Sequence, residues 1–329
     1  MNTDPLSFQK VLDSLLDEKK QFPARYLQEF SDIGTRELKS LLDVCERVQP
    51  GRKLSLLEQL ESLAESDTLV SFDNFARALL TDPDSTVRGR SIRLLNECED
   101  PRLVPTYINI LQNDPDPQTR AEAASVLGLF VDLGELEEIS EEVQDRVEDA
   151  LLAAANGEDE AKVRRRALES LGYASRPEII TLIESAFHRE DPAWQASAIL
   201  AMGRSADNRW DDDILRSLLS ENQNVREAAV EAAGQLGVKT ASPILIGILN
   251  EEDDDEVTSA AIWSLSQIGG EDARTYIENL LDQTEDDDQI EFMEEALDNL
   301  AFTEDLDRFD LMSFDPDVDL EEDDEGNDE

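Results

Sequence analysis

Apolar residues recur at helical spacing through most of the chain, with polar residues between them. In "NVREAAVEAAGQLG" (224–237), Val225, Ala229 and Ala233 fall four residues apart, on one face of a helix. Gly234 lies inside the same helix, where glycine costs about 1 kcal/mol relative to alanine. The pattern therefore predicts a helix that keeps a destabilising residue for a packing reason.

The same pattern recurs seven times between residues 82 and 301. Its first position is taken by Val87, Thr119, Val163, Trp194, Val225, Val257 and Phe292. The copies are 31 to 35 residues apart, except for one step of 44 that contains an acidic insertion at 132–143. A period of this length is typical of stacked helical repeats, which bury a shared core.

The ninth residue after the first position is small in most copies. This position is taken by Asn96, Gly128, Gly172, Gly203, Gly234, Ser266 and Ala301. A small residue here lets the backbone of a neighbouring helix come close. We interpret the four glycines as structural, because they lack the preceding strand and the spacing of a phosphate-binding loop.

A second helix is predicted after each of these first helices. The second helices are expected at 105–111, 144–154, 177–187, 212–219, 242–249 and 272–281. Pro105, Pro177 and Pro243 suit the first turn of a helix. Acidic turns before the first helices, such as 82–85 and 114–117, supply N-cap oxygens. The sequence therefore predicts an all-α fold of antiparallel helix pairs.

Three segments follow from this pattern. Residues 1–81 are helical but off-pattern, with helices expected at 6–19, 24–30, 35–48, 53–65 and 71–80, and are predicted to cap the array. Residues 82–301 form the repeat array. Residues 302–329 are acidic and are predicted to be disordered. Phe309, Leu311, Met312 and Phe314 in this tail are candidates for a partner-binding anchor that folds on a partner or docks on the array.

The repeats resemble HEAT repeats, particularly the phycobilisome-lyase-like class. The resemblance rests on "DPDSTVRGRSIRLL", "EDEAKVRRRALESLG" and "ENQNVREAAVEAAGQLG", which share an acidic turn, a Val-Arg pair and spaced alanines, with a Leu-Gly ending in the last two. It implies an α-solenoid, a superhelix of stacked antiparallel helix pairs. It also implies that the repeated arginines pair with the turn acids of stacked repeats and are structural. These arginines are Arg88, Arg120, Arg164 and Arg226, whereas Gln195, Thr258 and Met293 depart from the pattern.

Charge narrows the partners that we expect. The chain has 29 basic and 78 acidic residues, a net charge of −49, which repels nucleic acid and anionic lipid. A surface of this kind is also a known adaptation for solubility or salt. The start has no signal-peptide pattern and no apolar run is long enough to cross a bilayer, so we expect a cytoplasmic protein without membrane insertion. Cys45 and Cys98 are interpreted as reduced, inert core thiols.

The sequence offers little for catalysis, so we expect no enzyme and no cofactor. His188 is the single histidine, expected at a helix end or on the surface, and no multi-histidine metal site is available. Deoxyhypusine hydroxylase resembles this chain in its scaffold but uses repeated His-Glu pairs, and "FHRE" (187–190) offers none. The acidic runs 251–256 and 284–289 lack the glycine-containing loop of a calcium site.

Binding is the function that such an array favours. The second helices are expected to line a concave surface, with partner-binding candidates Asn109, Arg146, Thr181, Glu184 and Arg216. The basic segments 87–93 and 161–167 lie on first helices and are expected on the outer face. There they make ion pairs, or meet an acidic partner or the chain's own tail.

Two functions follow. The first is a non-enzymatic scaffold or adaptor that binds a protein partner, with the acidity selecting a basic one. The alternative is an accessory subunit of a lyase-like or protein-modifying enzyme, as the resemblance to bilin lyases implies.

Overall fold

Every element of the described residues is helical. The computed structural model describes residues 8–251 and 254–313, with only the backbone for residues 251 and 307–313. The chain divides into two compact units, Met1–Ala201 and Met202–Glu329, and the division falls inside one helix. None of the described helices is both long enough and apolar enough to span a membrane.

The first unit begins with short helices that share one core. They are α1 (Phe8–Leu16), the 3-10 helix η1 (Ala24–Phe30), α2 (Thr35–Cys45), α3 (Pro50–Ser66) and α4 (Asp73–Leu79). Phe30 and Phe75 pack with ring centroids 5.2 Å apart, and both side chains are buried. Val87, the first residue of the repeat pattern, belongs to the same core cluster, so the N-terminal region packs directly on the array.

The helices that carry the repeated pattern are called ladder helices here. They are α5 (Ser85–Arg93), α7 (Pro117–Glu135), α9 (Ala161–Ser170), α11 (Pro192–Arg204), α13 (Gln223–Gln235), α15 (Asp255–Ile268) and α17 (Asp287–Ser313). The helices between them are called flanking helices. They are α6 (Val104–Asn113), α8 (Glu141–Asn156), α10 (Pro177–Phe187), α12 (Asp211–Ser217), α14 (Ser242–Glu251) and α16 (Glu271–Leu281).

Aspartates of the acidic turns cap several ladder helices as the sequence predicts, whereas α13 is capped by Asn222. Asp84 accepts hydrogen bonds from the backbone N–H groups of Thr86 and Val87 at the start of α5, and Asp254 does the same for α15. At α9 the N-cap residue Glu160 makes no such bond. The neighbouring Asp159 is instead engaged by an arginine of the preceding repeat, described below.

The insertion at 132–143 lengthens a helix pair rather than forming a loop. α7 continues into it as far as Glu135, and α8 starts at Glu141. The carboxylate of Glu135 accepts hydrogen bonds from the backbone N–H and the hydroxyl of Ser175, at 2.9 and 2.5 Å. The extended end of α7 is therefore tied to the turn before α10.

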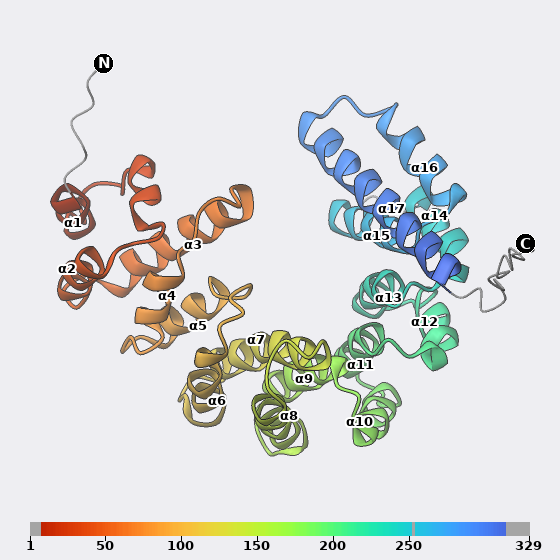
Figure 1. Cartoon of the computed structure of the whole chain (residues 1–329), viewed down its shortest axis with the longest axis horizontal. Helices are drawn as coiled ribbons and strands as arrows, with labels where there is room; N and C mark the ends of the chain where they lie inside the picture. Colours follow the sequence, from red (N-terminus) through yellow and green to blue (C-terminus); the bar gives the residue numbers. More distant parts are fainter. Residues whose placement is uncertain (1–7, 252–253, 314–329) are drawn as a thin grey trace, which may run out of the picture. The chain divides into compact units, whose positions relative to one another are not determined.

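The two rows of helices differ in position from what we expected. Within residues 1–201, Figure 1 shows α5, α7 and α9 on the inner side of the bend and α6, α8 and α10 on the outer side. The expectation that second helices line the concave surface is therefore wrong for this unit. The ladder helices lie inside because their small residues let them pack more closely than the flanking helices.

The C-terminal boundary also differs from the predicted one. α17 runs through residues 301 and 302 and ends at Ser313, so 302–313 are helical rather than disordered. Phe309, Leu311 and Met312 lie in this last part of α17, where only the backbone is described. Phe314 and the rest of the tail, 314–329, lie outside the described residues.

Candidate protein-interaction surface

Glycine contacts hold successive ladder helices together. A Cβ placed on Gly172 would lie 2.6 Å from the carbonyl oxygen of Ala201 in α11. A Cβ on Gly203 would lie 2.6 Å from the Cα of Ala232 in α13. Gly128 and Gly234 approach Ser170 and Ser264 in the same way. Each glycine thus meets the next ladder helix, not the flanking helix of its own pair.

The residues that face these glycines are also small, and they share one position. Ser170, Ala201, Ala232 and Ser264 are each the seventh residue after the first position of their repeat. The hydroxyl of Ser170 donates to the carbonyl of Ala124, and that of Ser264 to the carbonyl of Val230, both at 2.8 Å. The sequence prediction covered the glycines but not this second set of small residues, although its spacing is equally regular.

The last ladder helix joins its neighbour at the same level. Ser266 of α15 takes the place of the glycine and Asn299 of α17 the place of the small partner. The side-chain amide of Asn299 donates to the Ser266 hydroxyl at 2.9 Å. A polar pair therefore replaces the glycine contact at the end of the array.

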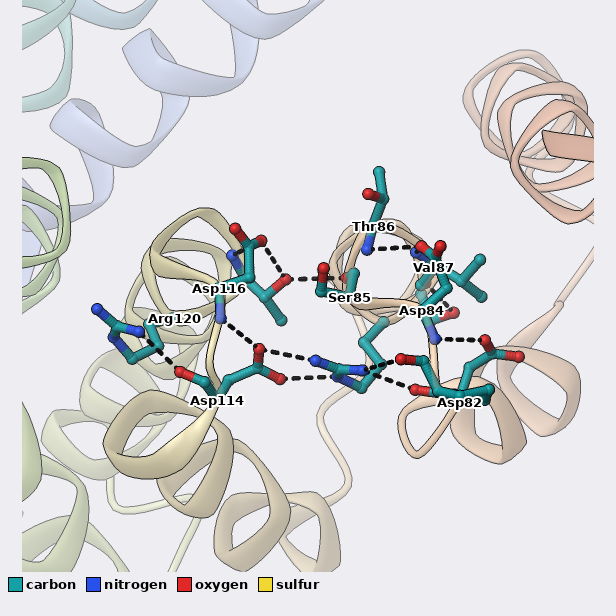
Figure 2. Close-up of polar contacts among 12 residues, drawn as sticks. Asp82, Asp84, Ser85, Thr86, Val87, Asp114, Asp116 and Arg120 are labelled. Carbon is teal, nitrogen blue, oxygen red and sulfur yellow. Dashed lines mark hydrogen bonds and ion pairs between the residues drawn. The ribbon is translucent and has the colours of Figure 1, made fainter. Parts of the chain in front are cut away.

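Arginines tie each ladder helix to the turn of the next repeat. Arg88 makes a two-point contact with Asp114, with Nε and Nη2 at 2.7 and 2.8 Å from its carboxylate oxygens (Figure 2). Its Nη1 also donates to the carbonyl of Asp82, in its own turn, at 2.7 Å. Arg120 repeats the arrangement with Asp159 and the carbonyl of Asp114. This is the pairing with turn acids that the resemblance implied.

The electrostatics of Asp114 follow from this contact. Burial alone would raise the pKa of its carboxyl group, but hydrogen bonds from Arg88 and from the backbone N–H of Asp116 outweigh burial and lower it. The Arg88 and Asp114 side chains are only 12 and 4 % exposed. Charge-assisted, two-point contacts of this kind are stronger than neutral hydrogen bonds.

A lysine that we did not predict extends the series into the N-terminal region. Nζ of Lys53, on α3, lies 2.5 Å from the carboxylate of Asp82, and both side chains are buried. Asp82 holds the same place in its turn as Asp114 in the next one. The pair α3 and α4 therefore joins the array as a repeat, with a lysine in place of the arginine.

The other two arginines make different contacts. Arg164 donates to the carbonyl of Ala155 at 3.2 Å, and its guanidinium lies 5.3 Å from the ring centroid of Trp194. Arg226 donates to the carbonyl of Ser220 at 2.8 Å. Gln195, which departs from the arginine pattern, makes the equivalent bond to the carbonyl of Arg189 at 2.8 Å. The backbone part of the contact is therefore retained without the arginine.

The basic segment 87–93 is largely occupied by internal ion pairs, and in 161–167 Arg166 pairs with Glu169 of its own helix. Arg90 of α5 pairs with Glu58 and Glu61 of α3, at 2.9 and 2.7 Å. Arg93 bridges Glu61 and Glu122. These segments lie on the inner row, so the expectation that they face outward is wrong within residues 1–201. Ion pairing is one of the roles that we expected for them.

The predicted partner-binding residues of the array lie on flanking helices. Asn109 is on α6, Arg146 on α8, Thr181 and Glu184 on α10, and Arg216 on α12, and all five side chains are exposed. Arg216 pairs with Asp213 of its own helix. The four in the first unit therefore belong to the outer row, not to one inner surface.

The titratable groups do not assemble into a reactive centre among the described residues. His188 is the exposed C-cap residue of α10, a helix-end position as predicted. No group of three or more His, Cys, Asp or Glu side chains in the described part of the chain is placed to hold a metal ion. Cys45 and Cys98 are buried free thiols, and burial raises the pKa of Cys45 to about 11.

A polar pocket of about 370 Å³ lies between the α3–α4 turn and the end of α5. Phe72, Asp73, Arg93 and Cys98 are among its lining residues. Burial raises the pKa of the Cys98 thiol, which makes it a poor nucleophile.

These contacts define an all-helical repeat protein of the α-solenoid class. The sequence profile of HEAT repeats matches residues 73–149, 148–221 and 212–298, and the chain belongs to the HEAT-repeat family. The matched segments begin at or within one residue of the starts of α4 and α12, and within α8. The family's repeat therefore starts with the helix that we took as the second of each pair.

The chain is also similar to several solved structures. The complex of CpcE and CpcF of phycocyanin lyase from Nostoc sp. is 17 % identical, covers 91 % of this chain and 97 % of its own, and has a TM-score of 0.50. The YibA protein of Escherichia coli is 17 % identical, with 86 % and 99 % covered and a TM-score of 0.40. Human deoxyhypusine hydroxylase is 16 % identical, with 90 % and 96 % covered and a TM-score of 0.36. No curated protein matches the chain.

Proposed function

We propose that this chain is a non-enzymatic scaffold or adaptor that binds a protein partner through the solvent-facing side chains of its ladder helices. One observation carries the proposal. The ladder helices are held to one another by glycine contacts along their sides and by arginine–aspartate pairs at their ends. The remaining faces of these helices are exposed to solvent. Because the helices are held in place by many contacts, a partner can bind to them without a large rearrangement.

The partner is a basic protein. The net charge of −49 attracts cationic surfaces and disfavours nucleic acid, whose binding needs clustered Lys and Arg. The excess of acidic over basic residues is larger in residues 202–329 than in residues 1–201, with 39 acidic and 7 basic residues in the later part. The two buried free thiols fit a reducing compartment, so we place the protein in the cytoplasm.

A binding role without catalysis is favoured by the titratable groups that the structure describes. The single histidine caps a helix in solvent, and the two thiols are buried with raised pKa values. The accessory-subunit alternative has no residue-level support among the described side chains. The likeness to the CpcE–CpcF complex is one of fold, at 17 % identity.

The test is affinity capture from the native cell with the full chain, over a salt series. Ser125 is exposed on the inner ladder helix α7, and Asn109 is exposed on the outer helix α6. We expect a stoichiometric protein partner that dissociates with salt, is lost with Ser125→Arg and is kept with Asn109→Arg. Loss with Asn109→Arg alone would move the binding face to the flanking helices.

The tail is tested in the same experiment. A truncation at 313 leaves α17 whole, whereas one at 301 would cut through this helix. If the 1–313 chain captures the partner as well as the full chain does, the tail is no anchor. Failure to capture any stoichiometric partner with the full chain would contradict the proposed function.

A further inference from the structure

The ladder helices of the second unit carry an unusual excess of acids. α13, α15 and α17 up to residue 306 contain twelve Asp and Glu residues and one base, Arg226. That guanidinium donates to the carbonyl of Ser220 and so belongs to the repeat framework. By contrast, α5 and α9 in the first unit contain seven Lys and Arg residues and one acid. The acidity is therefore concentrated on one part of the ladder row.

Two aromatic side chains lie within this acidic part. Trp263 of α15 and Phe292 of α17 have ring centroids 6.4 Å apart and are tilted by 32°. Both side chains are only partly buried, whereas the neighbouring Ser264 and Met293 are buried. The two rings thus form a shared apolar contact surface at the solvent-facing side of two adjacent ladder helices.

Two exposed glutamates accompany the aromatic pair, one on the preceding ladder helix α13 and one on α17 itself. Gly234 of α13 meets Ser264 of α15, so Glu231, one turn before Gly234, lies within about one helical turn of the level of Trp263, one residue before Ser264. Glu231 is exposed. On α17, Glu295 is exposed and follows Phe292 by one helical turn. Glu231 accepts a hydrogen bond from the side-chain amide of Gln235 at 3.0 Å and keeps its negative charge. An aromatic surface with exposed carboxylates nearby attracts planar or compact cations, for which tryptophan is the best partner.

We propose that Trp263 and Phe292, with Glu231 and Glu295, form a binding surface for an extended Arg- or Lys-rich segment of a partner protein. The proposal rests on the proposed function and specifies one of its contacts. A cationic side chain stacks on the Trp263 ring while the two glutamates pair with it or with its neighbours in the segment. The charge complementarity selects the occupant, because the surface repels acidic peptides, nucleic acid and anionic lipid alike.

The test uses the purified full chain and a fluorescein-labelled peptide of alternating Arg and Ser, followed by fluorescence anisotropy. A Glu–Ser peptide of the same length is the negative probe. We expect the Arg–Ser peptide to bind and the Glu–Ser peptide not to bind. Trp263→Leu should weaken binding about five-fold, the size expected of one cation–π contact. Glu231→Gln should weaken it about three-fold, as for an exposed ion pair.

Two control variants separate this surface from general acidity and from a folding defect. Asp212→Asn removes one exposed charge on the flanking helix α12 of the same unit and should leave the affinity unchanged. Trp263→Phe keeps an aromatic face and should keep most of the binding. Equal weakening by Asp212→Asn and Glu231→Gln would overturn the proposal, as would unchanged binding with Trp263→Leu or no binding of the Arg–Ser peptide.

The outcome is distinguishable from failure of the proposed function. If the peptide test fails while a partner is still captured through the ladder helices, only the aromatic–acidic surface is wrong. If no partner is captured by the full chain, the scaffold function itself fails, whatever the peptide does.

Discussion

Gly234 of α13 packs against the backbone of Ser264 of α15: a Cβ on Gly234 would lie 2.7 Å from the Ser264 Cα. The same contact recurs between glycines and small residues of other ladder helices. The loss of helix stability at glycine is therefore offset by close approach of the next helix.

Gly234→Ala should destabilise the protein by about 1–3 kcal/mol, because the added methyl group cannot fit against backbone. Gly247→Ala is the matched control. Gly247 lies exposed in α14 with nothing within 4 Å of an added Cβ, so alanine there should raise stability by up to about 1 kcal/mol. Thermal unfolding of both variants, followed by circular dichroism, tests the pair. Equal effects of the same sign would contradict the packing role.

Arg88→Met should destabilise the protein by about 3 kcal/mol, because it leaves the buried Asp114 carboxylate without its cation. The matched control is Arg102→Ala. The Arg102 side chain is 85 % exposed and pairs with Asp100, which keeps Arg77 as a second cation, so its loss should cost less than about 1 kcal/mol. Urea unfolding of the two variants measures the difference.

Asp114 should also contribute a dependence on pH. Its pKa is lowered in the fold, so the folded state binds the proton less tightly than the unfolded state. Its stabilising contribution is therefore present above the unfolded pKa, near 4, and is lost as the pH falls further. Asp114→Asn should flatten the stability curve below pH 4, and an unchanged curve in the variant would count against the Arg88–Asp114 pair.

Glu148 should contribute a pH dependence of stability opposite in sign to that of Asp114, and Glu148→Gln tests it. Burial raises the pKa of this α8 carboxyl, although Gln144 donates to it and Arg176 lies 3.4 Å away. The folded state therefore binds the proton more tightly, and stability is lost as the pH rises through the folded pKa. We expect the variant to be more stable than the wild type at neutral pH. The exposed neighbour Asp149, which also pairs with Arg176, provides the control Asp149→Asn, which should not raise stability.

Lys53→Met tests whether α3 and α4 form a true repeat. The substitution leaves Asp82 buried without its cation, so we expect a loss of about 3 kcal/mol. Hydrogen exchange should show faster opening of α3, α4 and α5 together. Exchange that is faster in α3 alone would indicate that the N-terminal region is independent of the array.

Much of the fold can be predicted from the sequence because every repeat uses the same pattern of apolar, small and capping residues. The spacing of Val225, Ala229 and Gly234, copied along the chain, is enough to predict the ladder helices and their acidic caps. It is harder to predict which helix begins each repeat, because a row of stacked helix pairs has the same sequence pattern whichever helix is counted first. The inner position of the ladder row depends on how closely ladder helices pack compared with flanking helices. The sequence of one helix does not reveal this difference.

The contacts of individual residues were less predictable. Lys53 does not resemble the repeated arginine in sequence, and only the position of Asp82 in space identifies its role. Gln195 and Trp194 replace an arginine contact by different chemistry, a carbonyl hydrogen bond and a ring beneath Arg164. Such substitutions keep the position of the contact but change the residues that make it. A sequence pattern based on residue types therefore does not predict these contacts.

The contact between position nine of one ladder helix and position seven of the next has a consequence for how the array can change. Four of these interfaces place a glycine against a serine or an alanine at the same two positions, so one helix pair is an interchangeable module. A copy inserted or deleted between Gly172 and Gly203 would find compatible neighbours on both sides. The binding surface can therefore become longer or shorter by whole helix pairs. The exposed residues that contact the partner can vary independently of these interfaces.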